Sequence, residues 1–397
     1  MVGTVVKSPM YAQNRSAASR EQYRTEVYIV SNKKETCPEL SAEQVQELRQ
    51  RRRKARRKRA GVVIDRIFGF LMATVIVVGL ACLGLEYVLV KGPSPALRDT
   101  FVMTMLETRR FGFIPRIFLT QQEVEEIRAL KSVHQNVDFD PTLIQIASEN
   151  EGEENPAQPL DGQSTGSPYG LVDEDGDGLI LEEVHGRGFS GYMLIVLDPS
   201  RVFIANGGGG LIIETMVQNN GAIAGINAGA FYDPNGQGSG GKPEGLTIYD
   251  GVVASYGYGC DPIAGFDENH ILHVGYHTLE QAVNSGIVSC VSFGPPLIIN
   301  GNPADPAELV SGVNPRTAIG QRADGAILML VIDGRQGASM GANYTDWMEM
   351  MLHYGAVNAS NMDGGSSTVM YLNGQVINSP SSATGGSRWL PNAFLVR

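Results

Sequence analysis

The chain has 397 residues, of which 43% are hydrophobic and 18% are charged. This composition is ordinary for a folded protein and excludes a chain that is disordered throughout. The 48 glycines favour turns and strand junctions over a helical bundle. The net charge of -11 is unevenly spread, since residues 1–60 carry 15 Lys and Arg against 6 Asp and Glu, whereas the rest carries 16 against 36. Such a split predicts two different environments.

A membrane-crossing helix is predicted where the two parts meet. Residues 61–90 are apolar, and the charge-free run from Ile67 to Leu85 is about long enough to cross a bilayer. The basic run Arg51–Ala60 precedes it and places the N-terminal side in the cytoplasm. We therefore expect a single-pass protein of the cell membrane, with residues 1–60 as a basic, mostly disordered cytoplasmic tail that contacts lipid and the remaining domain outside.

Three alternatives to this interpretation are less favoured. A cleaved signal peptide fits poorly because about 60 residues precede the apolar run and no clear small-x-small cleavage site follows it. A buried core helix fits poorly with the flanking charges. A nucleic-acid patch could explain the basic run, but a spanning segment follows at once and anionic lipid explains the charge, so we expect no nucleic-acid partner.

Two short helices are predicted in residues 91–131. Ser94 is typical of an N-cap and Pro95 of the first helical position. Thr120 and Glu123 form a capping-box pattern that opens a second helix, which ends near Lys131. The two helices form a stalk or pack on the next domain. Residues 132–170 are polar, with Pro, Gly and Ser, and indicate a linker.

Residues 171–397 predict an α+β domain built around a large, curved, mixed β-sheet with a few packed helices. Short β-branched runs alternate with glycine, and two-residue turns such as Asp250-Gly251 indicate much antiparallel pairing. Helices are predicted at residues 345–356, with Thr345 as the N-cap, and at residues 278–285 and 212–219.

Metal sites and disulfides have weak signals. Cys260 and Cys290 lie in the part expected outside the cell, where a disulfide is possible, but no spacing indicates a zinc site. The stretch from Asp173 to Val184 resembles the start of an EF-hand loop, but position 12 is Val184 where a Glu is required. An acidic loop that enters a strand is favoured, and we expect neither a metal nor a cofactor.

Four glycine-bounded polar clusters stand at the ends of predicted strands. They are GINAGAFYDP with Asn227, Phe231, Tyr232 and Asp233; NPRTAIG with Arg316 and Thr317; VIDGRQG with Asp333 and Arg335; and NMDGGSST with Asp363. One such cluster is most simply a turn, and Asp333 alone could be a turn residue that allows a positive φ at Gly334. Four clusters in one domain favour a functional site.

These residue types suit cleavage at an anionic sugar linkage. Two carboxylates can divide the acid and base roles, and an arginine can hold a phosphate in a bidentate fork. Adjacent glycine amides and hydroxyls can form an anion nest. A serine-hydrolase triad fits poorly because the chain has no G-x-S-x-G motif.

The ordered set NAGAF, NPRTAIG, DGR and N-x-DGG-S-S/T resembles the phosphodiester glycosidase family, which includes the lysosomal uncovering enzyme and bacterial proteins linked to exopolysaccharide synthesis. The resemblance covers roughly Gly186 to Arg397. The expected site consists of catalytic Asn227, Arg316, Asp333 and Asp363, with Gly364, Gly365, Ser366, Ser367, Thr368 and Arg335 around the phosphate. One departure is visible: the uncovering enzyme's motif is similar to DGGGS, whereas Ser366 replaces its third glycine here.

Together with the predicted membrane-crossing helix, which is not part of the resemblance, the resemblance implies a membrane-anchored extracellular hydrolase. It would cleave the glycosidic bond of a sugar-1-phosphodiester in a surface glycopolymer or exopolysaccharide. Asp363 or Asp333 acts as acid or base while water attacks, with retention or inversion left open. The alternatives are a glycopolymer phosphotransferase and a non-catalytic glycan-binding module on the same fold.

Overall fold

The computed structural model describes residues 41–108, 111–129, 138–146, 170–233, 240–257, 259–306, 309–382 and 385–397. The chain divides into two units, Met1–Ala81 and Cys82–Arg397. The predicted tail residues 1–40 lie outside the described residues.

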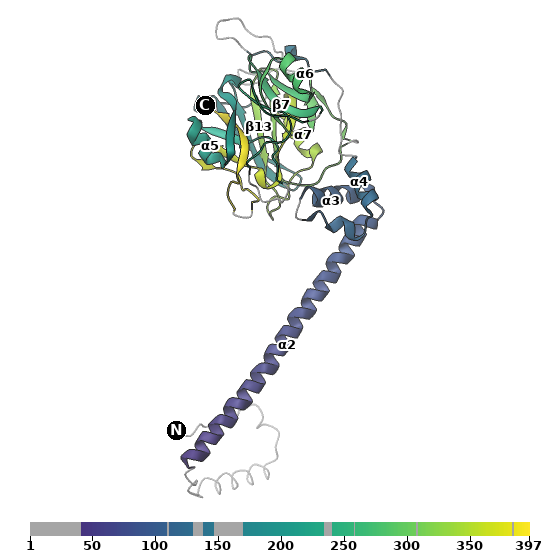
Figure 1. Cartoon of the computed structure of the whole chain (residues 1–397), viewed down its shortest axis with the longest axis vertical. Helices are drawn as coiled ribbons and strands as arrows, with labels where there is room; N and C mark the ends of the chain where they lie inside the picture. The colour runs from purple at the N-terminus through teal and green to yellow at the C-terminus, as the bar shows by residue number, and fades with distance from the viewer. Residues whose placement is uncertain are drawn as a thin grey trace, which may run out of the picture. The chain divides into compact units, whose positions relative to one another are not determined.

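Helix α2 (Ala42–Lys91) contains the predicted membrane-crossing segment (Figure 1). Its part Asp65–Lys91 is long and apolar enough to cross a membrane. The prediction of disorder is wrong for residues 42–60, which belong to the same helix. Arg, Lys, Glu and Gln are good helix formers, and Ser41 and Gln44 form a reciprocal capping box with bonds of 3.0 and 3.3 Å.

Two further helices follow α2, as predicted. Helix α3 (Pro95–Glu107) is capped by Ser94, whose side chain accepts a hydrogen bond from Leu97 N at 3.3 Å. After the 3-10 turn Ile114–Ile117, helix α4 (Gln121–Ala129) begins with the predicted capping box of Thr120 and Glu123. Their shared apolar cluster consists of Val90, Val102, Met103, Leu119, Val124 and Ile127.

The two helices pack on the following domain, which is one of the two arrangements that the sequence left open. Val313 N donates a hydrogen bond to Thr104 Oγ1 at 2.9 Å. At Gly312 an added Cβ would lie 2.4 Å from Thr104 Cα, so the backbones of α3 and the 309–316 segment touch directly. Part of the predicted linker also contacts the domain, since the Phe139 ring lies 4.4 Å from that of His273.

The α+β class is confirmed, but the strands form three sheets in place of one mixed sheet, and every pair among the described residues is antiparallel. The largest sheet runs β1 (Leu179–Gly186), β2 (Phe189–Val196), β13 (Ile327–Ile332), β12 (Arg316–Arg322), β14 (Ala356–Met362), β10 (Pro296–Ile299) and β11 (Asn302–Pro303). The second runs β16 (Gln375–Val376), β15 (Met370–Leu372), β4 (Ala224–Asn227), β17 (Leu390–Val396) and β3 (Val202–Leu211). The third runs β6 (Val252–Ser255), β5 (Thr247–Tyr249), β9 (Ile287–Ser292), β7 (Asp261–Asp267) and β8 (Leu272–His277).

Tight hairpin turns explain part of the antiparallel pairing. Asp250 and Gly251 both have positive φ, at 46° and 77°, between β5 and β6. Asn373 and Gly374 do the same, at 46° and 100°, between β15 and β16. Two consecutive positive φ values define the type I′ turn, whose twist matches that of paired strands.

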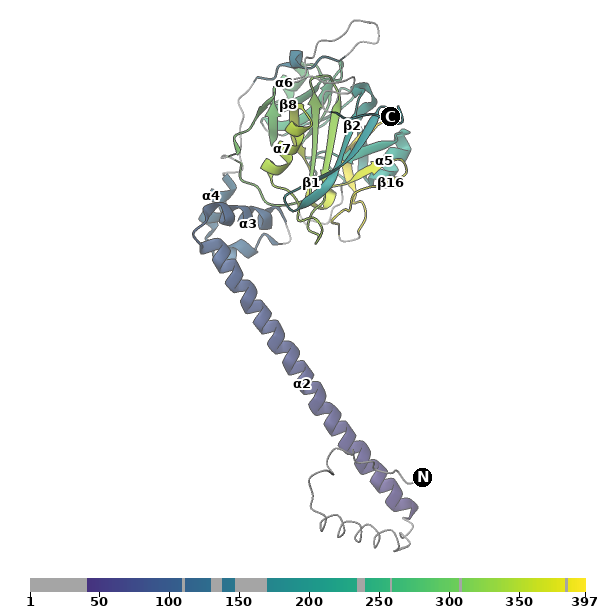
Figure 2. The same ribbon diagram turned by 180° about the vertical axis from the view of Figure 1, so that it is seen from behind.

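The largest sheet is buried on both faces. Along β13, Leu328, Leu330 and Ile332 face the cluster that contains helix α7 (Tyr344–His353). The alternate residues face a second cluster shared with the other two sheets. Figures 1 and 2 show α7 on one side of the large sheet, while α5 (Ile213–Asn220) covers the second sheet on the other side.

The predicted helices of this domain are present, with one correction. Helix α6 (Leu279–Asn284) begins at Thr278 and α5 lies where it was expected. The N-cap of α7 is Asn343, not Thr345, because the Asn343 side chain accepts the bond from Asp346 N and Asp346 bonds back to Asn343 N.

The structure also describes Cys260, Cys290 and the acidic loop before β1. Cys260 is an exposed free thiol, and Cys290 is a buried one whose pKa burial raises to about 12. Asp173 accepts hydrogen bonds from Gly176 N and Gly178 N at 2.9 Å each, in a turn that leads into β1. This geometry agrees with an acidic loop at a strand entry.

Candidate active site

A polar cavity of about 300 Å³ opens where several strand ends meet. Its charged lining residues are Glu107, Asp233, Glu244, Asp363, Arg335 and Arg388. Backbone from Gly364 to Ser366 and the side chains of Phe231 and Phe293 complete much of the wall. Arginines, carboxylates and glycine amides in one small cavity can bind an anion and move a proton beside it.

The Asp363 loop follows β14 and turns sharply over Pro315. Asp363 N donates to Ala228 O and Gly365 N donates to Pro315 O, both at 2.9 Å. A Cβ at Gly364 would lie 2.8 Å from Pro315 O, and Gly365 has a φ of +63°. Both glycines are therefore required by the backbone path. The path brings the loop amides to the cavity wall.

Ser366, which departs from the uncovering enzyme's motif, contacts an arginine that the sequence analysis did not select. Arg388 Nη1 donates to Ser366 Oγ at 2.7 Å and to Ser367 Oγ at 3.4 Å, and Nη2 pairs with Asp233 Oδ2 at 3.0 Å. Its guanidinium also lies 5.0 Å from the centroid of the Phe231 ring. These partners hold Arg388 rigidly in the wall.

Arg335 is the second cavity arginine, and its backbone is strained. Its φ is +60°, a conformation that costs roughly 1–2 kcal/mol outside glycine. The turn-only interpretation expected the positive φ at Gly334, but the structure has it at Arg335. Arg335 Nη2 donates to Asn314 Oδ1 at 2.9 Å, and burial followed by the nearby Arg316 charge lowers its pKa. A strained, exposed arginine at a cavity is a candidate for function.

Asn227 lies behind the cavity at the end of β4. Its Nδ2 donates to Asp363 O, while its Oδ1 accepts from Thr317 Oγ1 at 2.8 Å and Val369 N at 3.1 Å. It is fully buried. Asn227 therefore joins β4 to β12 and fixes both ends of the segment from Asp363 to Val369.

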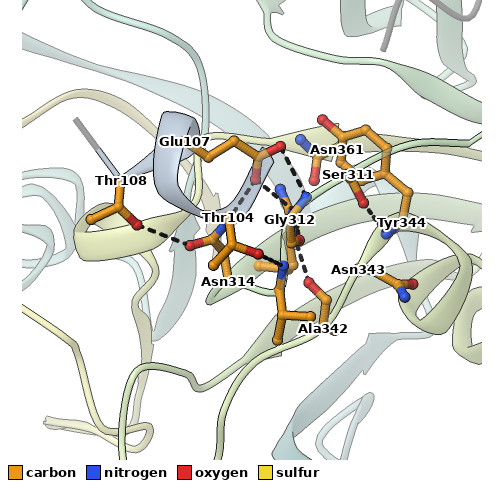
Figure 3. Close-up of polar contacts among 12 residues, drawn as sticks. Thr104, Glu107, Thr108, Ser311, Gly312, Asn314, Ala342, Asn343, Tyr344 and Asn361 are labelled. Carbon is orange, nitrogen blue, oxygen red and sulfur yellow. Dashed lines mark hydrogen bonds and ion pairs between the residues drawn. The ribbon is translucent and has the colours of Figure 1, made fainter. Parts of the chain in front are cut away.

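Arg316 also lies behind the cavity. Its guanidinium pairs with Glu107 Oε2 at 2.9 Å, donates to Ala342 O at 3.0 Å and to Gly312 O, and stacks over the Tyr344 ring. Figure 3 shows Glu107 reaching from α3 toward Gly312 and Asn314. These contacts anchor α3 to the domain.

Asp333 has its carboxylate away from the cavity lining. Its oxygens accept from Asn378 Nδ2 at 2.9 Å and Ser379 N at 3.0 Å. Burial raises its pKa above the ordinary value, while these hydrogen bonds act in the opposite direction. In this arrangement Asp333 holds the segment that follows β16.

The expected site residues thus separate into two layers. Asp363, Gly364, Gly365, Ser366 and Arg335 line the cavity, and Asn227, Arg316, Asp333, Ser367 and Thr368 do not. Sequence reasoning did not select Glu107, Glu244 or Arg388. Arg388 had a usable signal, since it stands after two glycines next to a strand terminus, and glycines next to strand termini also mark the four clusters. Glu107 had none, because a glutamate at the end of a helix is ordinary.

Known proteins resemble this chain over its C-terminal half. Residues 220–397 match the phosphodiester glycosidase family model. An uncharacterized SPbeta prophage-derived protein, YomE of Bacillus subtilis, is 28% identical over 43% of this chain and 27% of its own length. The mouse N-acetylglucosamine-1-phosphodiester alpha-N-acetylglucosaminidase is 26% identical over 53% of this chain and 45% of its own. The chain thus spans less than half the length of these curated relatives.

A solved structure is also similar. The catalytic domain of zebrafish N-acetylglucosamine-1-phosphodiester alpha-N-acetylglucosaminidase, auto-inhibited by its pro-peptide, covers 56% of this chain and 85% of its own, at 19% identity and a TM-score of 0.48.

The fold and the cavity define an α+β domain with arginines, carboxylates and glycine backbone gathered in one cavity at its strand ends. Residues 220–397 match the phosphodiester glycosidase family model, in agreement with the resemblance of the ordered motifs.

Proposed function

We propose that the chain is a phosphodiester glycosidase that hydrolyses the glycosidic bond of a sugar-1-phosphodiester. The observation that carries the proposal is the joint presence of Arg335, Arg388 and the Gly364–Gly365 backbone beside Asp363 in one cavity. The family relation and the printed activity of the mouse relative support the same reaction class.

In the proposed mechanism, Arg335 and Arg388 bind the diester phosphate. Both present charged donors, which make stronger hydrogen bonds to an anion than neutral groups do. The backbone amide of Gly364 adds a dipole on the same side, whereas the amide of Gly365 already donates to Pro315 O. Arg316 takes no direct part in this scheme, because its guanidinium is directed at Glu107 and backbone carbonyls.

Asp363 acts as general acid or base at the anomeric centre. Water attacks the anomeric carbon, the bond from that carbon to the phosphate oxygen breaks, and a proton passes from the water to the medium through a carboxylate. Glu244 is the candidate for the second carboxylate, since it lines the same cavity. Removing a positioned acid or base costs about 10²–10⁴-fold in rate.

The proposed location is the cell membrane, with helix α2 as the anchor and the enzyme domain outside. The charge-free run of α2 and the basic residues before it support this orientation by the positive-inside rule. A sugar-phosphodiester of a surface glycopolymer or exopolysaccharide is the proposed substrate, and membrane lipid is the proposed contact of the basic segment.

The test is hydrolysis of a panel of sugar-1-phosphodiesters by the full chain in detergent, because α3 contributes to the cavity wall. Wild type is compared with Asp363→Asn and with a matched control, Asp198→Asn. Asp198 caps a 3-10 turn at residues 199–201, a role that Asn fills as well. We expect release of free sugar that only Asp363→Asn abolishes. Binding without turnover by wild type would favour a glycan-binding module, and equal activity of the two variants would remove Asp363 from the mechanism.

A further inference from the structure

The cavity wall includes a helix that lies outside the matched family region. Glu107 and Thr108, at the end of α3, line the same cavity as Arg335 and Asp363. The family match begins only at residue 220. The last turn of α3 is therefore a component of the site that the family relation does not assign.

A continuous chain of polar contacts runs from this helix to the cavity arginine. Asn314 Nδ2 donates to Glu107 Oε2 at 2.7 Å, and Arg335 Nη2 donates to Asn314 Oδ1 at 2.9 Å. Figure 3 shows the first of these contacts together with that of Thr108 to Asn314. Asn314 is 2% exposed and the Glu107 side chain is 12% exposed, so water hardly competes for the bond between them, whereas Arg335 is exposed and can meet a ligand.

The chemistry of the two ends fixes the orientation of the amide between them. A carboxylate only accepts hydrogen bonds and a guanidinium only donates them. The Asn314 amide must therefore turn its NH₂ toward Glu107 and its oxygen toward Arg335. If the group at position 107 could also donate, the amide could turn over and present NH₂ to Arg335, which would push the guanidinium away.

Helix α3 is held firmly enough to serve as the fixed end of this chain. Met103 and Val102 are buried, and the backbone of Gly312 touches Thr104 directly. Glu107 also pairs with the buried Arg316, which holds its carboxylate in place at 2.9 Å. These contacts make the end of α3 a fixed part of the cavity wall.

We propose that Glu107 is a positioning residue, which acts through Asn314 to hold Arg335 for the phosphate of the substrate. The inference rests on the proposed function for the identity of the anion, and it assigns part of the binding site to the helix next to the membrane-crossing segment. It predicts that loss of the Glu107 charge weakens anion binding. Electrostatics alone predicts the opposite, because removing a negative charge near Arg335 should strengthen the attraction for an anion.

The experiment measures binding of inorganic phosphate by titration calorimetry, and KM and kcat where an active diester is found. Both use the full chain in detergent. The variants are Glu107→Gln, Asn314→Ala and their double, with Glu125→Gln as the control, since Glu125 is an exposed residue of α4 that pairs only locally with Arg128. Each single variant should weaken phosphate binding about tenfold, the size of one lost bond to a charged group. KM should rise more than kcat falls.

Asn314→Ala keeps the Glu107–Arg316 pair, so it tests the chain of contacts even if Glu107→Gln unfolds. The double variant should bind no more weakly than the weaker single one, because both changes cut the same chain. Unchanged or tighter phosphate binding in the single variants, additive losses, or no phosphate binding by wild type would overturn the proposal. If wild type binds phosphate but releases no sugar, the proposed function is refuted. The positioning role stands in that case as long as the variants bind phosphate more weakly than wild type does.

Discussion

The buried pair of Arg316 and Glu107 gives a prediction that separates a structural role from a substrate-binding one. The two side chains are 6% and 12% exposed, and Arg316 also bonds to two backbone carbonyls and stacks over Tyr344. Removing one partner of a buried pair costs about 3–5 kcal/mol, because the other charge stays buried. For a domain of this size, 1 kcal/mol shifts Tm by roughly 2–4 °C. Arg316→Met should therefore lower Tm by about 10 °C.

Thermal unfolding of the full chain, followed by circular dichroism, measures this effect. The double variant Arg316→Met with Glu107→Met should recover at least half of the loss, since apolar replacement of a whole buried pair is often neutral. Arg187→Met is the matched control. Arg187 pairs with Glu349 at 4.0 Å and its side chain is 88% exposed, so the change should cost less than about 1 kcal/mol.

One result would refute this reasoning. If Arg316→Met leaves Tm unchanged but raises KM for the diester, Arg316 contacts the substrate directly, as the motif resemblance implied. A loss of stability that the double variant does not recover would show that the stacking on Tyr344 and the carbonyl bonds outweigh the ion pair.

Two further predictions concern single residues. Burial raises the pKa of Asp333, so its folded form keeps a proton that the unfolded form has lost, and stability falls as pH rises from the ordinary value of 3.8 through the raised one. Asp333→Asn should remove that fall in a pH series of denaturant unfolding and keep sugar release; a loss of activity above 100-fold at unchanged Tm would make Asp333 catalytic. Gly365→Ala should cost roughly 1 kcal/mol for its φ of +63° and also raise KM, because the new Cβ would lie 3.2 Å from Arg335 Nη2. The control Gly385→Ala shares a φ of +71° but meets open space, so an equal KM effect in both would contradict the contact argument.

The sequence could predict the parts of the site that are local. Asp363 and the two glycines stand next to one another, and the backbone path that needs those glycines is the same path that brings the loop to the cavity wall. Glu107 and Arg388 reach the cavity through tertiary packing between distant segments, which no short pattern records. The same limit explains why the role of Arg316 was not predicted. The motif indicated the strand on which Arg316 lies, but not the partner toward which its guanidinium turns.

For the fold, too, the local features could be predicted and the long-range ones could not. The uninterrupted apolar run at residues 327–332 is typical of a buried strand, and Asp250-Gly251 indicated a hairpin. The division into three sheets follows from long-range pairings, such as that of β4 with β17, which local periodicity does not contain. At α7 both Asn343 and Thr345 can cap a helix, and the reciprocal bond with Asp346 decided between them.

The order of strands in the second sheet has a consequence for biosynthesis. Strand β17 lies between β3 and β4, although it is made after both. Its Asn392 accepts a hydrogen bond from Gly229 N at 2.7 Å, and Arg388 stands just before it. While the chain is being translated, β3 and β4 thus wait with unpaired edges, and such edges favour aggregation. The cavity can close only after residues 388–396 have left the ribosome, so a nascent chain stopped before them would carry Asp363 and its loop without a finished site.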